Sequence, residues 1–121
     1  MNITGSYRLK KYGYDYKKTV EFKPISQWYA GEIHYQNNGH MTVIVRFAEN
    51  PEDFTDFVAY SGTYNVVGNE IHHLVTESVR PAYIGQKLTR VFKLEKDLLY
   101  TEFENTEEFI KFAHWEKIEK K

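Results

Sequence analysis

The chain contains no cysteine among its 121 residues. Disulfide bonds, thiolate metal sites and a cysteine nucleophile are therefore excluded, because each of them needs a thiol. The chain also lacks any apolar run that approaches the length of a membrane span. Its first residues, 1–8, lack the apolar segment of a signal peptide. We therefore expect a cytoplasmic protein with no membrane partner.

A large charge of one sign is also absent, since the formal net charge is −1. Nothing in this balance attracts the protein as a whole to nucleic acid. The stretch 10–18 mixes lysine with tyrosine, a composition found on surfaces that bind phosphates and stack bases. A solvated hairpin explains this stretch more simply, and we expect no nucleic-acid partner.

Several catalytic and cofactor motifs are missing as well. The sequence has no HExxH zinc motif, no phosphate-binding loop, no dinucleotide fingerprint and no Ser-His-Asp spacing. We therefore predict no metal and no cofactor. An enzyme built from this chain would depend on His, Arg, Tyr and carboxylate groups, which suit proton transfer, isomerisation, cyclisation or hydration.

Aromatic residues, in contrast, are abundant, with ten Tyr, eight Phe and two Trp making up 17% of the chain. Such a composition is typical of β-rich proteins, because aromatic side chains pack well on a pleated surface. The length suits one domain, residues 1–121. Alternating polar and apolar residues, with a hairpin turn at Asn37-Asn38-Gly39, predict successive strands. The predicted strands span residues 5–12, 19–22, 31–36, 41–47, 63–67, 70–77, 87–94 and 98–103.

One short helix is predicted after the fourth strand. Asn50 can cap its N-terminus and Pro51 suits its first position. Phe54, Phe57 and Val58 then follow at the i, i+3 and i+4 spacing of one helical face.

The last segment, residues 105–118, allows two interpretations. Its start is typical of a helix cap, and apolar residues at 109, 112, 113 and 118 would form a helical face. Residues 110, 112, 114 and 116 also alternate as they would in a strand. The hairpin pattern predicts an all-β fold, an antiparallel up-and-down β-barrel of about eight or nine strands.

A series of short motifs runs along the chain in a fixed order. They are Gly5-x-Tyr7, Gly31-x-Ile-x-Tyr35, Asn38-Gly39-His-Met41, Tyr60-Ser-Gly62-x-Tyr64, Ile71-His-His73, Arg90-Val-Phe92 and Trp115-Glu-Lys117. Over nearly the whole chain, their order and spacing resemble the lipocalin-like domain family, a calycin-type barrel group of bacteria and fungi. The resemblance implies a barrel that encloses a small molecule, and it favours the strand for residues 105–118.

The chain departs from that family at the closure of the barrel. The resemblance implies a Trp in the first strand that packs on an Arg in the last strand. Here Tyr7 and Lys117 stand at those positions. We expect a Tyr–Lys cation–π contact in place of the usual pair, worth about 0.5–1 kcal/mol if exposed.

The adjacent histidines His72 and His73 point to opposite faces of their strand and cannot share one metal ion. His73 shares its face with Ile71 and Val75, so it is the inward candidate. A hydrogen-bonded core histidine is the simplest interpretation. A pocket role and metal or haem ligation are the alternatives.

Arg90 lies on the same strand face as Leu88, Phe92 and Leu94, which places it inside the barrel. A buried guanidinium needs a partner, because removing it from water costs several kcal/mol, on the order of the penalty for other buried ions. The partner is a carboxylate, a Tyr hydroxyl, water or a ligand anion. A structural arginine and a ligand anchor remain equally open.

The remaining predictions concern the cavity mouth and its lining. The predicted helix with Phe57 forms a lid, and Tyr83 lies in a loop at the same mouth. The predicted ligand-binding residues are Arg90, His73, Tyr35, Tyr64, Val43, Val45, Phe92, Phe57 and Tyr83.

The main functional hypothesis is a protein that binds a small, mostly apolar molecule, with or without a carboxylate. The first alternative is an isomerase or cyclase, in which Arg90 stabilises an anion and His73 moves a proton. The second alternative is a filled barrel that acts as a structural or interaction protein. The sequence leaves these open, together with the choice between monomer and homodimer.

Overall fold

The computed structural model describes residues 2–50, 52 and 56–118, and these form a nearly pure β structure. The strands are β1 (Gly5–Tyr16), β2 (Glu21–Pro24), β3 (Trp28–Tyr35), β4 (His40–Ala48), β5 (Asp56–Val67), β6 (Glu70–Ser78), β7 (Lys87–Glu95), β8 (Leu98–Asn105) and β9 (Phe109–Lys117). A single 3-10 turn, η1 (Pro81–Tyr83), lies between β6 and β7. No helix in the described part of the chain is long and apolar enough to cross a membrane.

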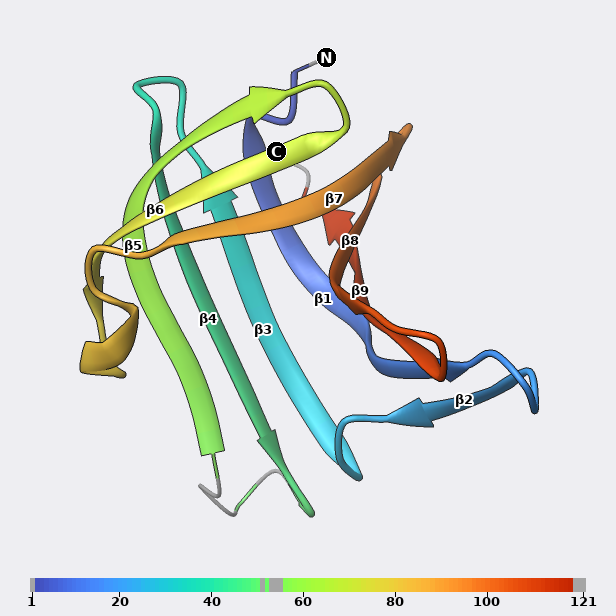
Figure 1. Ribbon diagram of the computed structural model, residues 1–121. Helices are drawn as coiled ribbons and strands as arrows, with labels where there is room; N and C mark the ends of the chain where they lie inside the picture. Colours follow the sequence, from blue (N-terminus) through green and yellow to red (C-terminus); the bar gives the residue numbers. More distant parts are fainter. Residues whose placement is uncertain (1, 51, 53–55, 119–121) are drawn as a thin grey trace.

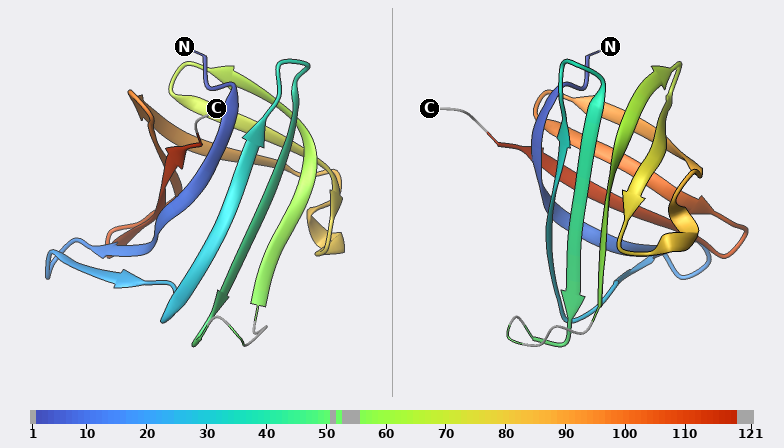
Figure 2. Two further views of the ribbon diagram at one scale, coloured as in Figure 1. Left: turned by 180° about the vertical axis from the view of Figure 1, so that it is seen from behind. Right: turned by 90° about the vertical axis from the view of Figure 1, so that its left-hand side faces the viewer.

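The strands form a closed antiparallel barrel, shown in Figures 1 and 2. Each strand from β3 to β8 pairs with the next, β1 pairs with β3, and β9 returns to pair with β1 from Tyr7↔Lys117 to Tyr16↔Phe109. Eight strands therefore make the barrel, and β2 is an extra strand paired only to the end of β1. This architecture confirms the predicted all-β, up-and-down barrel. Closure leaves the eight strands without long free edges.

The helix predicted after the fourth strand is wrong. Phe57 and Val58 belong to β5, which pairs residue by residue with β4 from His40↔Thr63 to Phe47↔Asp56. The i, i+3, i+4 pattern that suggested a helix is short, and the ladder of interstrand hydrogen bonds overrides it. Positions 51 and 53–55 of that prediction lie outside the described residues.

The strand predicted over residues 19–22 is displaced along the chain. Val20 lies in a turn with a φ of 52° and is 91% exposed, so it does not point inward. Phe22 lies in β2, and its ring packs on that of Phe112 with centroids 5.8 Å apart. The ammonium of Lys11 lies 4.3 Å from the Phe22 ring. Since Phe112 is only 2% exposed, β2 protects this part of β9 from solvent.

The last segment is a strand, which settles the alternative left open by its sequence. Residues 109–117 pair with both β8 and β1. The hydroxyl of Thr106 accepts hydrogen bonds from the N–H groups of Glu108 and Phe109 at 3.2 and 3.1 Å. Thr106, which the sequence places in a possible helix cap, therefore closes the turn between β8 and β9. A hydroxyl that accepts from an N–H group two or three residues later is found both in helix caps and in turns.

One end of the barrel, the closed end, is filled by aromatic side chains. Tyr7 is fully buried, and its hydroxyl donates to the carbonyl of Ile3 at 2.8 Å. The ring of Tyr35 packs edge-on against Tyr7 at 6.3 Å and against Tyr64 at 4.8 Å. Lys117 is exposed and lies over Gly5, and it makes no cation–π contact with Tyr7. The expected Tyr–Lys closure is therefore wrong, because the Tyr7 ring is already enclosed.

At the opposite end, the open end, β6 separates from β7 and a loop fills the gap. Val75 is the last point of contact: its N–H donates to the carbonyl of Gln86 at 3.0 Å, and its carbonyl accepts from Gly85 at 2.8 Å. Between these bonds the chain makes the loop 79–86, which contains η1. The N–H of Val79 donates to the carbonyl of Ala59 at 3.0 Å and ties the loop to β5.

Candidate functional site

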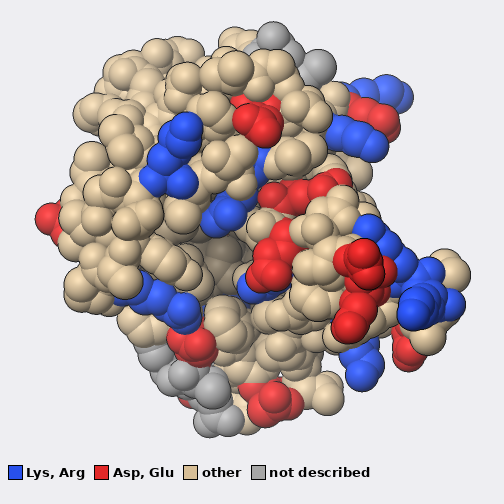
Figure 3. All heavy atoms as spheres, viewed as in Figure 1, with Lys and Arg blue, Asp and Glu red and all other residues tan. Residues whose placement is uncertain are grey.

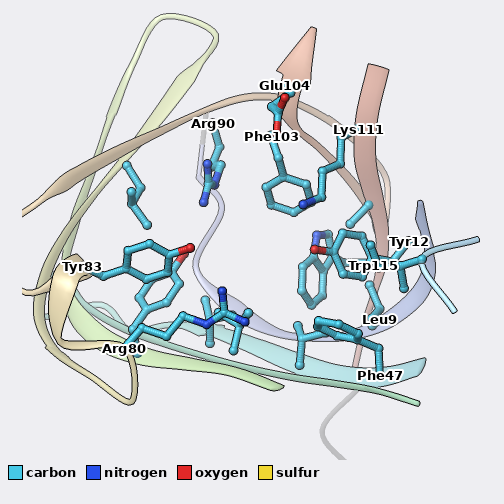
Figure 4. A pocket seen from close by; sticks show the side chains of 17 residues that line it. Leu9, Tyr12, Phe47, Arg80, Tyr83, Arg90, Phe103, Glu104, Lys111 and Trp115 are labelled. Carbon is cyan, nitrogen blue, oxygen red and sulfur yellow. The ribbon is translucent and has the colours of Figure 1, made fainter. Parts of the chain in front are cut away.

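The barrel interior is not completely filled, because a cavity of about 290 Å³ lies at the open end. Its apolar wall comes from several strands, and Trp115 and Leu9 lie opposite the loop 79–86 (Figure 4). Figure 3 shows the corresponding hollow on the surface, with basic and acidic side chains around it. The apolar side chains that line the cavity include Leu9, Val43, Val45, Phe47, Val58, Leu88, Phe103, Ala113 and Trp115.

Arg90 projects from β7 into this cavity (Figure 4). Its guanidinium carbon lies 4.7 Å from the centroid of the Phe103 ring, a cation–π distance. Its Nε is buried and has no hydrogen-bond partner among the residues that the structure describes. No described carboxylate forms an ion pair with it. The site therefore holds a cation whose hydrogen-bonding capacity is not fully used by the protein.

Two further cations line the same cavity. Arg80, in the loop 79–86, makes an ion pair with Asp56 through Nη2 at 3.2 and 3.3 Å from the two carboxylate oxygens. Lys111 projects inward from β9, and burial lowers its pKa, with further lowering by the charges of Arg90 and Arg80. Glu104 raises the pKa of Lys111 but does not outweigh burial.

His73 is buried in the barrel but does not line the cavity. Its Nε2 lies 2.7 Å from the hydroxyl of Tyr35, and its Nδ1 lies 2.8 Å from the hydroxyl of Tyr60. Burial, with a smaller effect of the Arg90 charge, lowers the pKa of His73 from 6.5 to about 3. The ring is therefore neutral near pH 7, which suits one donated and one accepted hydrogen bond.

Arg90 acts on the Tyr60 hydroxyl, at one end of these hydrogen bonds. Burial raises the pKa of Tyr60, and the adjacent Arg90 guanidinium opposes this rise through its charge and hydrogen bonding. A neutral imidazole donates through one ring nitrogen and accepts at the other, so His73 gives a proton to one of the two tyrosine hydroxyls and receives one from the other. Tyr60 is the one member of this Tyr35–His73–Tyr60 chain that the described cavity lining includes.

The structure brings together part of the predicted ligand-binding set. Arg90, Val43, Val45 and Tyr83 line the cavity. His73, Tyr35 and Phe92 are buried elsewhere in the core, and the Tyr64 hydroxyl donates to the carbonyl of Gln36 at the closed end. Phe57, in β5, pairs with Arg46 of β4 and is outside the cavity lining, so the described part of the predicted lid is a strand.

Tyr60, Arg80 and Lys111 also line the cavity, although the sequence did not predict them as ligand-binding residues. Tyr60 lies within the segment that the pattern predicts as a helix, so its place on a strand face is not evident from the sequence. Lys111 lies in the segment whose strand and helix interpretations competed, and it shares a strand face with Ala113 and Trp115. The alternation of residues 111, 113 and 115 is the one sequence signal that indicates an inward Lys111.

A second polar cluster lies on the outside of β1 and β3. Nδ1 of His34 lies 2.7 Å from the Ser6 hydroxyl, and its Nε2 lies 3.0 Å from a carboxylate oxygen of Glu32. These residue types match a hydrolase triad, but Ser6 lies within a paired strand. A catalytic serine usually stands on a sharp turn beside free N–H groups that bind the oxyanion. The described residues also contain no group of three metal-ligating side chains.

Comparison of the chain with protein-family models, curated proteins and solved structures gave no match. The chemistry of the site therefore follows from its own geometry. Its described lining combines apolar walls with Arg80, Arg90 and Lys111 and a single carboxylate, Glu104. This is the combination that suits an anion carried on an apolar body.

Proposed function

We propose that the protein is a lipocalin-like binding protein that holds a small, mostly apolar molecule with an acidic group in its barrel. The observation that carries the proposal is the buried, unpartnered Nε of Arg90 beside a cavity. An arginine in this position costs free energy unless a partner satisfies it. A ligand carboxylate or similar anion provides that partner, and Phe103 holds the guanidinium in place by stacking.

The walls supply most of the affinity in this proposal. Apolar surface gains roughly 25 cal/mol for each Å² removed from water, so a hydrocarbon body stabilises the complex more than a polar one. A cavity of about 290 Å³ lies near the lower limit of typical ligand pockets. The ligand is therefore small, and the cations orient its acidic end.

The direct test measures the binding of a fluorescent apolar anion, anilinonaphthalene sulfonate, and its displacement by short-chain fatty acids. The unmodified protein is expected to bind the probe and release it to the acids. Arg90→Met is expected to weaken binding by about tenfold or more, since a charge-assisted hydrogen bond contributes about 1.5–3 kcal/mol. Native mass spectrometry of protein from its own host provides a second measurement of a retained molecule.

The matched control is Arg46→Met. Arg46 lies 4.9 Å from the ring of Trp28, away from the described cavity lining, so its loss removes the same charge without touching the cavity. Equal binding by the unmodified protein and Arg90→Met would overturn the proposal. So would the absence of binding for every apolar anion tested.

A second candidate function is an isomerase or cyclase on the same barrel. The observation that favours it is the position of Tyr60, between Arg90 and His73 and in contact with the cavity. Tyr60 would be the group that exchanges a proton with a bound substrate, while His73, with a pKa of about 3, would position it. This candidate replaces His73 with Tyr60 as the residue that meets the substrate.

Deuterium uptake distinguishes the two functions. A ligand with an acidic C–H is incubated with the protein in D₂O and analysed by mass spectrometry. An enzyme is expected to accelerate the exchange, and Tyr60→Phe is expected to abolish the acceleration while retaining the ligand. Exchange at the uncatalysed rate, with normal binding, would leave the protein as a binding protein.

A further inference from the structure

The charges around the cavity are not balanced by the described residues. Arg80 has Asp56 as an ion-pair partner, but Arg90 and Lys111 pair with no carboxylate in the described part of the chain. Glu104 faces Lys111 across the β8–β9 ladder, yet no ion pair joins them. In Figure 4 the carboxylate of Glu104 lies away from the cavity, while the Lys111 ammonium points into it. Two unpaired cations therefore share one apolar space.

Lys111 is held toward the cavity by its strand and its neighbours. Its ammonium lies 5.8 Å from the ring of Tyr12 and 5.9 Å from the ring of Tyr14, both in β1. The side chain is half-buried, and burial is the main reason that its pKa is lowered. The charges of Arg90 and Arg80 lower the pKa further. An added negative charge at this place would favour the charged form of Lys111 and so oppose this lowering.

Arg90 and Lys111 approach the cavity from two different strands, β7 and β9. Phe103 and Tyr12 pack edge-on with ring centroids 5.5 Å apart, and Arg90 lies against the first ring and the Lys111 ammonium near the second. Both cations line the same cavity, and Figure 4 shows their side chains directed into it. The charge of Arg90 acts on Lys111 across this space, so an acidic group bound there interacts with both charges.

From this geometry we infer that the acidic group of the ligand is a dianion, a phosphate monoester on an apolar body, held between Arg90 and Lys111. The inference rests on the proposed function. A carboxylate carries one negative charge, so it neutralises one cation and leaves the other half-buried without a partner. A phosphate monoester carries a charge close to −2 at pH 7 and has three terminal oxygens for two sets of donors. Arg and Lys are also the side chains that bind phosphate most often.

Two amphiphiles with the same chain, hexyl phosphate and hexyl sulfate, test the inference by displacement of anilinonaphthalene sulfonate at pH 8. Both head groups are tetrahedral, but only the phosphate is a dianion at this pH. The unmodified protein is expected to prefer the phosphate by about tenfold, the effect of one added charge-assisted interaction. At pH 5 the phosphate is a monoanion, since its second pKa is about 6, and the preference is expected to disappear.

Variants assign the preference to Lys111. Lys111→Met is expected to bind hexyl sulfate within about threefold of the unmodified protein and to lose the preference for phosphate. Lys111→Arg is expected to retain it, because it restores the charge. Lys93→Met is the matched control, because Lys93 lies on the exposed face of β7. It should change neither affinity.

The outcomes separate the two proposals. Equal affinities of the unmodified protein for hexyl phosphate and hexyl sulfate would overturn the dianion inference and leave the binding function intact. A phosphate preference that survives in Lys111→Met would overturn the role of Lys111. If neither the probe nor either amphiphile binds to the unmodified protein, the proposed function fails as well.

Discussion

The two ends of the barrel interior contain similar side chains that are satisfied in different ways. At the closed end, the hydroxyls of Tyr7, Tyr35 and Tyr64 each have a partner within the protein, at 2.7–2.9 Å. At the open end, Nε of Arg90 has no partner, and Lys111 has no ion pair with any described residue. The closed end is packed, whereas the open end has a cavity of about 290 Å³.

This difference separates structural polar groups from candidate binding groups. A buried polar group that the protein itself satisfies adds to the stability and uniqueness of the fold. A buried group that is left unsatisfied reduces stability and keeps its interactions available for a ligand. His73 belongs to the first kind and Arg90 to the second, although Tyr60 lies beside both. Substitutions at the closed end should therefore affect stability, and those at the open end should affect binding.

The largest expected effect is that of His73→Leu. The change removes both ring nitrogens and leaves the hydroxyls of Tyr35 and Tyr60 buried without this partner. We expect the free energy of unfolding in urea to fall by about 2–5 kcal/mol, the cost of two unsatisfied groups. His72→Leu, on the outer face of the same strand, should cost under about 1 kcal/mol. Similar losses in the two variants would contradict the structural role of His73.

The second prediction concerns acid. The pKa of His73 is about 3 in the folded protein and near 6.5 in the unfolded chain. Between these values the unfolded chain binds a proton that the folded protein excludes. The free energy of unfolding therefore decreases as the pH falls through this window, by up to about 1.4 kcal/mol per pH unit, or about 2–3 kcal/mol from pH 6 to pH 4.

The comparison that isolates this contribution uses His73→Gln. Its side chain keeps a donor and an acceptor but does not titrate. Urea unfolding at several pH values is expected to give a shallower pH dependence for this variant than for the unmodified protein. Parallel curves would show that His73 does not carry the acid sensitivity.

The third prediction concerns Arg90→Met at the open end of the barrel. Replacing a half-buried cation that has no ion pair among the described residues by an apolar side chain of similar length should leave the free energy of unfolding unchanged or raise it by about 1 kcal/mol. Ligand binding should be weakened in the same variant. Thermal unfolding measures the first effect and probe displacement the second. A loss of more than about 1 kcal/mol would instead identify Arg90 as a structural arginine.

The smallest expected effect is that of Asp56→Asn at the rim of the open end. The ion pair of Asp56 with Arg80 is largely exposed, so its loss should cost under about 1 kcal/mol in urea unfolding. Arg80 is then free to interact with an anion in the cavity. We expect hexyl phosphate to bind up to about threefold more tightly at low salt, with the gain removed at high salt. Weaker binding would contradict this role of the pair.

The strands and the inward direction of Arg90 and His73 could be predicted from sequence, because alternation with apolar neighbours fixes the face of a strand. The partners of these residues could not. Arg90 meets Phe103 and Tyr60 through the closure of the barrel, and His73 bridges two tyrosines from β3 and β5. Such contacts depend on register between strands, which no local pattern contains.

The errors have local physical causes. Phe57 and Val58 fitted a helical spacing, and only the pairing of β5 with β4 shows that they form a strand. Lys111 was missed because it lies where helix and strand patterns overlap. The ladder shifts register between Leu9 and Lys11 in β1, so Tyr12 follows Leu9 into the interior at an interval of three residues. A bulge of this kind changes which residues face inward beyond it.

The loop 79–86 is fixed at both of its ends. Its C-terminal end is held by hydrogen bonds of Gly85 and Gln86 to Val75 in β6, and its N-terminal end by the hydrogen bond of Val79 to Ala59 in β5. Because these hydrogen bonds hold both ends, changes in the length or sequence of the loop between them need not change the register of the strands. Arg80 and Tyr83, which face the cavity, lie between those ends. For protein engineering, the loop can therefore be varied on its own. Libraries of loop sequences alter which molecules enter the cavity, while the strands of the barrel keep the same pairing.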